Sequence, residues 1–375
     1  MRVWFNLSEV AGILVFLTAN IWMICIFSYL RWPAGSVSFG TLQVGRNGGH
    51  GEVHQSGGTV SAGGGWFGIT NDGAAPSGLY DLNGGQLTVT AGAIEVGAEG
   101  SGELRVTGTG QLTSNAIHLG QRGGGTGTLN VGNSAIVTVN GQIVVGFGSA
   151  NANVFNLNGG TVSVSDRVSI GTAGNVGTAN LVGGSLTTGS IEAGGGTTSL
   201  NLGATTIRAN QTQPDFIRGF TNSAGHSAIN LTETGPTIDT NGFDVRITQA
   251  NVFADADGLV NGLNGTVVTK TGAGTLTIES ATDTDGTVAF HAVQGTSDFE
   301  SSQTLDTLDI GGGATVTLSD LASAPAPAES GAALFEGGSS SSLNSVQGVP
   351  EPGAISLLVM GALAITGRRR QRSKS

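Results

Sequence analysis

The stretch LYDLNGGQLTVTAGAIEVG, residues 79–97, contains the pattern that decides the fold. Apolar residues alternate with polar or small residues on both sides of Asn83-Gly84-Gly85, as in strands with one buried face. Glycine and asparagine lie where the backbone must turn with positive φ. The stretch closes with a short apolar unit, Ile94–Gly97, that ends on glycine. It therefore predicts short strands joined at glycine corners.

Both parts of this stretch recur along the chain. The glycine-ending unit returns at Leu42–Gly45, Trp66–Ile69 in a degenerate form, Ile117–Gly120, Ile143–Gly146, Val168–Gly171 and Ile191–Gly194. Successive glycines of these units lie 23, 29, 23, 26, 25 and 23 residues apart. The strand pair around a turn returns between most of them, at residues 51–60, 104–112, 154–164 and 179–186. The half-repeat is therefore about twelve residues long.

A unit of this size cannot bury its apolar face alone, but copies stacked about 4.8 Å apart build one continuous core. We therefore predict an all-β fold, a right-handed parallel β-helix or β-solenoid, with glycine-rich repeats over residues 36–210. About seven turns would form a rod section roughly 34 Å long. The alternative is an antiparallel meander in which Asn83-Gly84 and Asn158-Gly159 are hairpin turns, because Asn-Gly favours hairpins. Recurrence of a complete unit favours the solenoid.

The body of the chain is strongly acidic. Between Ser36 and Pro352 there are 8 Lys plus Arg and 25 Asp plus Glu, so the net charge is 8 − 25 = −17. This charge excludes binding to nucleic acid or to an anionic membrane through electrostatic attraction. The single cysteine, Cys25, lies within an apolar N-terminal run, so the body has neither disulfides nor thiol chemistry.

The N-terminal run from Val10 to Leu30 carries no charge and is followed by Arg31. It is long enough to span a bilayer, so residues 1–35 are expected to be a helical signal peptide or signal anchor. Small residues at Ala34-Gly35-Ser36 favour cleavage by signal peptidase after passage through the secretion translocon. Both alternatives place the body outside the cytoplasm.

The C-terminal end, residues 349–375, reads VPEPGAISLLVMGALAITGRRRQRSKS. Its two prolines, Pro350 and Pro352, prevent a helix from extending upstream. The fifteen residues 353–367 carry no charge. As a helix they would span roughly 22 Å, less than the roughly 30 Å hydrocarbon core of a bilayer, although flanking arginines can snorkel. The basic cluster that follows would remain on the cytoplasmic side.

This order of segments resembles a PEP-CTERM sorting signal. The resemblance rests on Val349, Pro350, Glu351 and Pro352, the apolar run, and Arg368, Arg369 and Arg370. It implies export in a bacterium with an outer membrane and a transient transmembrane helix in the inner membrane. It also implies processing near the motif by exosortase, a membrane-embedded cysteine transpeptidase, followed by release or attachment at the surface. The other hypothesis is a plain C-terminal membrane anchor.

Two further segments lie between the glycine-rich repeats and the tail. Residues 211–321 contain looser repeats, and the part from Gly265 to Ile278 resembles the autotransporter-associated β-strand repeat through its Lys-Thr-Gly-Ala-Gly-Thr-Leu-Thr-Ile core. The glycine-rich units resemble repeats of PEP-CTERM proteins, and both resemblances imply further rungs. Residues 322–348 are rich in Ala, Pro, Ser and Gly, so we expect a flexible linker.

Few residues are placed for chemistry. His50 and His54 would share one strand face as a possible metal pair, but no third ligand is expected nearby. The runs Asp255–Gly258 and Asp283–Gly286 contain half of a calcium loop, but neither has the first ligand or the terminal glutamate of an EF-hand, and acidic turns explain them more simply. Only three aspartates and no lysine precede residue 210, which disfavours the paired carboxylates of a polysaccharide lyase or hydrolase. We therefore expect no catalytic residues, no metal and no cofactor.

These features together predict a noncatalytic structural protein of the cell surface, outer membrane or extracellular matrix, as in a biofilm. Its expected partners are the translocon, signal peptidase, exosortase and exopolysaccharide. The alternative is a carbohydrate-binding adhesin on the same β-helix scaffold, and a polysaccharide lyase is the third hypothesis.

Overall fold

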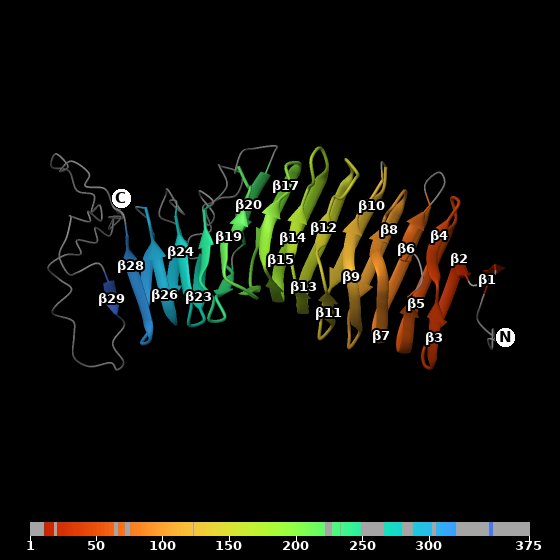
Figure 1. Ribbon diagram of the computed structural model, residues 1–375, viewed down its shortest axis with the longest axis horizontal. Coiled ribbons are helices and arrows are strands. Elements are labelled where there is room, and N and C mark those ends of the chain that lie inside the picture. Colours follow the sequence, from red (N-terminus) through yellow and green to blue (C-terminus); the bar gives the residue numbers. More distant parts are fainter. Residues whose placement is uncertain are drawn as a thin grey trace, which may run out of the picture.

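The protein is an elongated stack of β-strands, as Figure 1 shows. This computed structural model describes residues 11–18, 21–63, 67–71, 76–122, 124–221, 227–232, 234–248, 266–279, 288–301, 305–319 and 345–347. All regular elements within these ranges are strands, and neighbouring turns of the chain pair in parallel. The prediction of an all-β parallel solenoid is confirmed, and the antiparallel meander is wrong.

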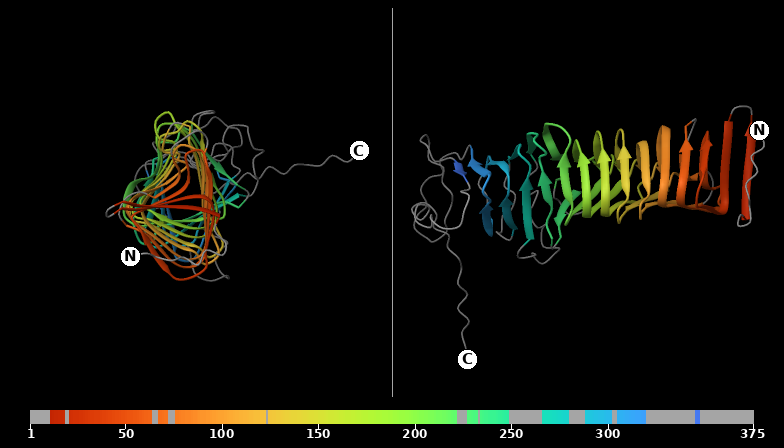
Figure 2. Two further views of the ribbon diagram at one scale, coloured as in Figure 1. Left: turned by 90° about the vertical axis from the view of Figure 1, so that its right-hand side faces the viewer. Right: turned by 90° about the horizontal axis from the view of Figure 1, so that it is seen from below.

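The strands form three faces around a central core, seen end-on in Figure 2. Face A contains the first parts of β5 (His50–Ala62), β7 (Ser77–Val96), β13 (Ala152–Val164) and β15 (Val176–Thr188), with β8 (Ser101–Val106), β10 (Thr126–Val131), β17 (Thr197–Leu202) and β20 (Ser227–Leu231). Face B contains β3 (Ser36–Phe39), later parts of β5, β7, β13 and β15, the start of β9 (Gln111–Leu119), β11 (Ile136–Val139), β18 (Thr206–Ala209), β21 (Thr237–Asp239), β23 (Thr266–Thr271), β25 (Val288–Ala292) and β27 (Thr307–Ile310).

Face C closes each turn of the solenoid. It contains β4 (Thr41–Arg46), β6 (Phe67–Asn71), the ends of β7 and β9, β12 (Ile143–Val145), β14 (Arg167–Ile170), β16 (Ser190–Ala193), β19 (Gln213–Arg218), β22 (Val245–Ile247), β24 (Thr275–Ile278), β26 (Gly295–Phe299) and β28 (Ala314–Leu318). At the far end, β29 (Ser345–Gln347) pairs antiparallel with β28. The predicted glycine-ending units supply most of face C.

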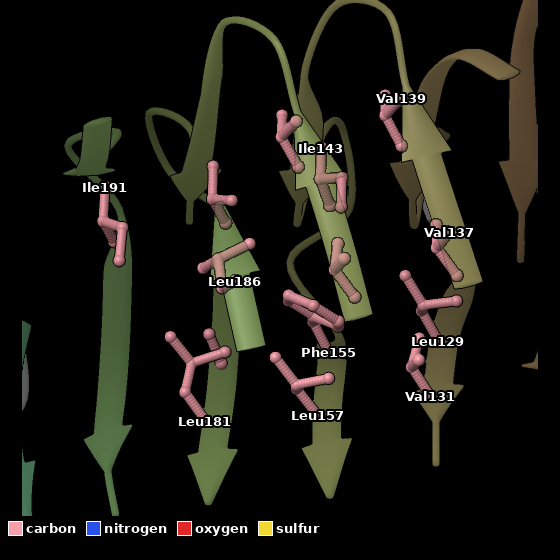
Figure 3. Packing of buried hydrophobic residues seen from close by; sticks show 14 of the residues in the cluster. Leu129, Val131, Val137, Val139, Ile143, Phe155, Leu157, Leu181, Leu186 and Ile191 are labelled. Atoms are coloured by element: carbon pink, nitrogen blue, oxygen red, sulfur yellow. The ribbon is translucent and has the colours of Figure 1, made fainter. Parts of the chain in front are cut away.

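The core consists of columns in which each inward side chain lies on its equivalent from the next turn. On face B, for example, Leu87 pairs with Leu112, which pairs with Val137 and then Val162, and all four are buried. Figure 3 shows such side chains from opposite faces filling the interior. Each turn therefore buries its apolar positions only against its neighbours, as the alternation predicted.

Glycine is required at the corners of the turn. Gly97, between faces C and A, has φ of +70°, and a Cβ there would lie 2.0 Å from the carbonyl oxygen of Thr126. Gly85, between faces A and B, has φ of +78°, and its Cβ would lie 2.4 Å from the carbonyl oxygen of Gly58. Neither corner can hold a side chain, because the backbone conformation and the atoms of an adjacent turn both forbid it.

The stack continues without a break across the predicted boundary between residues 210 and 211. β15 pairs with β18 and β18 pairs with β21 on face B, while β16, β19 and β22 pair in series on face C. Within the described part of the chain, strands after β20 extend only faces B and C. The looser repeats of the second section therefore add turns to the same rod.

The described residues of the N-terminal segment form two strands at the open end of the stack. β1 (Ala11–Thr18) and β2 (Ile21–Trp32) are strands; β1 pairs antiparallel with β2, and β2 pairs parallel with β4 and β5. In this arrangement the backbone of β2 is hydrogen-bonded on both sides, to β1 and to the open end of the stack. A bilayer offers no such edge, and there a helix satisfies its backbone hydrogen bonds internally. The helix of the membrane-inserted state remains a prediction.

Candidate functional site

The residues of the predicted sorting signal lie outside the described residues. These are Val349, Pro350, Glu351, Pro352, Arg368, Arg369 and Arg370. The short C-terminal helix expected over residues 353–367 and the acidic runs at Asp255–Gly258 and Asp283–Gly286 also lie outside them. Their roles remain predictions, and the geometry of the rod supplies the other candidate sites.

The two neighbouring histidines lie together on the outer side of β5, as predicted. Glu52 lies between them and accepts hydrogen bonds from His50 Nε2 at 2.8 Å and His54 Nε2 at 3.0 Å, which lower the pKa of Glu52. His54 Nδ1 is 3.2 Å from the Asp81 carboxylate of the next turn. We expected no third potential ligand, so these two carboxylates correct that expectation. Even so, no group of three such side chains in the described ranges has the geometry to hold a metal ion.

A third histidine, His118, is partly buried on the outer side of face C. Its ring stacks on Phe147 with centroids 4.2 Å apart and planes 2° apart. Glu95, which is only 8% exposed, occupies the equivalent position on the preceding turn. Burial lowers the pKa of His118 and favours the neutral imidazole. The sequence analysis did not single out His118, but alignment of the units Ile94–Gly97 and Ile117–Gly120 would have placed Glu95 and His118 together.

Further along face C, charged side chains from adjacent turns are held in ion pairs. Glu192 lies 2.8 Å from Arg167 and 2.6 Å from Arg218. Arg246 lies 2.6 Å from Glu300 and 3.4 Å from Glu279. Glu192 and Glu279 contact arginines of adjacent turns, and Glu300 contacts Arg246 two turns away. This arrangement joins successive turns, and it differs from two carboxylates directed at one substrate position.

A lysine is fully buried at an inward position of face B. Lys270 follows Ile238 and precedes Ala292 in the core column, and its side chain is 0% exposed. Its Nζ donates to the backbone oxygens of Gly272 at 2.6 Å, Gly274 at 2.7 Å and Gln294 at 2.7 Å. The lysine of the Lys-Thr-Gly-Ala-Gly motif therefore fastens its own corner and the corner of the next turn.

Burial lowers the pKa of Lys270 to about 8, although the Asp239 and Asp244 carboxylates oppose the shift. An unfolded lysine titrates near 10.5. Between these two values the unfolded chain binds more protons, so the free energy of unfolding should rise as the pH increases from about 8 to about 10.5. Lys270 alone can raise the free energy of unfolding by no more than about 1.4 kcal/mol per pH unit. Urea unfolding at several pH values measures this rise, and Lys270→Met should remove it; an equal rise in the variant contradicts the assignment.

Face A carries an asparagine ladder on its outer side. Four consecutive hydrogen bonds of 2.5–2.7 Å join the amides of Asn130, Asn156, Asn180, Asn201 and Asn230 from turn to turn. Asn130 also donates to Glu103 at 2.8 Å. These side chains use their donors and acceptors on one another, so the ladder joins successive turns and is occupied by internal contacts.

Comparisons with known proteins identify no relative. No protein-family model, curated protein or solved structure matches the chain. Among the described residues, no helix has the length and apolar character needed to cross a membrane. A function is therefore inferred from the sequence pattern and from the geometry of the three faces.

Proposed function

We propose that the protein is a noncatalytic, exported structural protein of the bacterial cell surface or extracellular matrix. The observation that carries the proposal is the order of segments in residues 349–375, where a Pro-Glu-Pro motif precedes an apolar run and an arginine cluster. In this proposal the translocon and signal peptidase handle the N-terminal segment, and an exosortase-type transpeptidase processes the C-terminal one. The mature rod then associates with exopolysaccharide.

The rod supports this proposal through its physical properties. Its turns are joined by a continuous apolar core, the asparagine ladder and ion pairs between turns. Such a stack presents long, regular outer surfaces and protects its backbone within strands. We further propose the right-handed winding that parallel crossover connections adopt. Both terminal segments would be helices while they are inserted in the membrane.

Processing can be tested by replacing Pro350, Glu351 and Pro352 with alanine in a bacterial host that contains an exosortase. We expect the unaltered chain to lose its arginine cluster and to leave the inner membrane, because the transpeptidase needs an exposed, extended motif. The variant should keep the cluster and remain in the inner-membrane fraction. Cell fractionation and mass spectrometry of the mature C-terminus measure both results.

A matched control replaces Ser339, Ser340 and Ser341 with alanine, which changes the chain upstream but leaves the motif intact. This control should be processed like the unaltered chain. An intact arginine cluster on the mature, unaltered protein would disprove processing at this tail.

A carbohydrate-binding adhesin is the second candidate function. It is favoured by one observation, the uncharged, hydroxyl-bearing outer surface of face B between β3 and β15.

A further inference from the structure

Two columns of small polar side chains run along the outer side of face B, and we call them the hydroxyl strip. One column contains Ser38, Ser61, Thr88, Thr113, Thr138, Ser163 and Thr187. The other contains Ser36, Thr59, Gln86, Gln111, Ile136, Thr161, Ser185 and Thr206. Successive members of a column lie about 4.8 Å apart, and the columns lie about 6.6 Å apart.

The hydroxyl strip carries no charged side chain, although the body around it has a net charge of 8 − 25 = −17. The first charged side chain along these columns is Arg208, which follows Thr187 and lies 3.3 Å from the Asp239 carboxylate. A polyanion or polycation would find no partner of opposite charge on this surface. The strip therefore favours a neutral ligand.

The hydroxyl groups of the strip are free to bind. Within the part of the chain that the structure describes, none of its serine or threonine side chains hydrogen-bonds to another protein group, and Gln86 donates to Gln111 at 3.2 Å. The asparagine ladder on face A differs, because its amides are already bonded to one another. Each free hydroxyl can both donate and accept a hydrogen bond.

An apolar side chain lies in the middle of the strip. Ile136 is 46% exposed and stands between Gln111 and Thr161 in its column. A sugar ring has hydroxyl groups at its edge and apolar C–H groups on its faces, so it can contact Ile136 and nearby hydroxyls together. The regular repeat of the strip matches a polymer of such rings better than a single small molecule.

We propose that the hydroxyl strip binds an extended, neutral polysaccharide that lies along the axis of the rod. Hydroxyl and amide side chains supply the hydrogen bonds, and Ile136 supplies an apolar contact. This inference rests on the proposed function only for the statement that the chain meets polysaccharide outside the cell. Binding is tested on purified protein, so its failure can be distinguished from failure of export or processing.

The experiment measures co-sedimentation of the purified full chain with insoluble neutral β-glucans, cellulose and curdlan, with pectate as the anionic comparator. Replacing Thr88, Thr113 and Thr138 with alanine removes three hydroxyls from the strip. Loss of several hydrogen bonds should weaken binding by roughly tenfold or more. The matched control replaces Thr126, Thr128 and Thr178 on the outer side of face A, and it should bind like the unaltered chain.

A single substitution, Thr113→Arg, tests binding to the hydroxyl strip independently if the triple variant unfolds. It adds bulk and charge at an outward position and should also weaken sedimentation. The proposal fails if the unaltered chain sediments with neither glucan, if it binds pectate equally well, or if both triple variants lose binding equally. Unchanged binding by Thr113→Arg would also overturn it.

Discussion

Replacement of Lys270 by alanine is expected to lower the free energy of unfolding by about 3 kcal/mol or more. The change removes the three hydrogen bonds that Nζ donates to the backbone oxygens of Gly272, Gly274 and Gln294, and a hydrogen bond made by a charged group contributes about 1.5–3 kcal/mol. It also empties the space of a side chain that is 0% exposed. Hydrogen exchange should show the loss first in β23 and β24, because a stacked turn depends on its direct neighbours.

Two variants separate the possible causes of that loss. Lys270→Met keeps most of the apolar stem but has no donor, so it should destabilise nearly as much as alanine if the hydrogen bonds dominate. Thr269→Ala changes the adjacent outward residue and should alter stability by no more than about 0.5 kcal/mol. Stability of Lys270→Ala within that same margin would show that the lysine does not hold the corners together.

For Lys270, the sequence predicts the direction of the side chain but not its burial. The alternation in residues 266–271 puts Lys270 in phase with the inward-facing Val268, so its direction follows from the period of a strand. The resemblance to a known repeat singled out its motif. Burial of the Lys270 amine, however, depends on three carbonyl oxygens from two turns. The local sequence does not show that these oxygens lie within hydrogen-bonding distance of Nζ. Counting only apolar residues as core therefore missed it.

The architecture was easier to predict than the contacts between turns. Recurrence of a strand-and-glycine unit predicted the parallel stack, because units of this kind can bury their apolar positions only on one another. The spacing of units varies from 23 to 29 residues, so contacts across turns require the exact register. Asp81 beside His54 became visible only when that register was known, whereas Glu52 shares a strand with His54 and Glu95 aligns with His118 once their units are superposed.

The second large effect is expected at a corner. Gly97→Ala should lower the free energy of unfolding by more than about 3 kcal/mol, because it combines two penalties. The first is the φ of +70°, where a residue with a Cβ is strained by about 1–2 kcal/mol. The second is a Cβ placed 2.0 Å from the oxygen and 2.3 Å from the carbonyl carbon of Thr126. These backbone atoms can retreat only by disturbing the pairing of Thr126 with Ser101.

Gly174→Ala is the matched control, since Gly174 has φ of +80° but no atom within 4 Å of the added Cβ. Gly174→Ala should lower the free energy of unfolding only by the cost of the backbone conformation, about 1–2 kcal/mol. Urea unfolding of both variants measures the difference, and hydrogen exchange in β8 and β10 should increase only in Gly97→Ala. Equal destabilisation would mean that the corners need glycine for its backbone conformation alone. A larger loss at Gly97 would show that contact between successive turns fixes the glycine, and with it the spacing of the repeat.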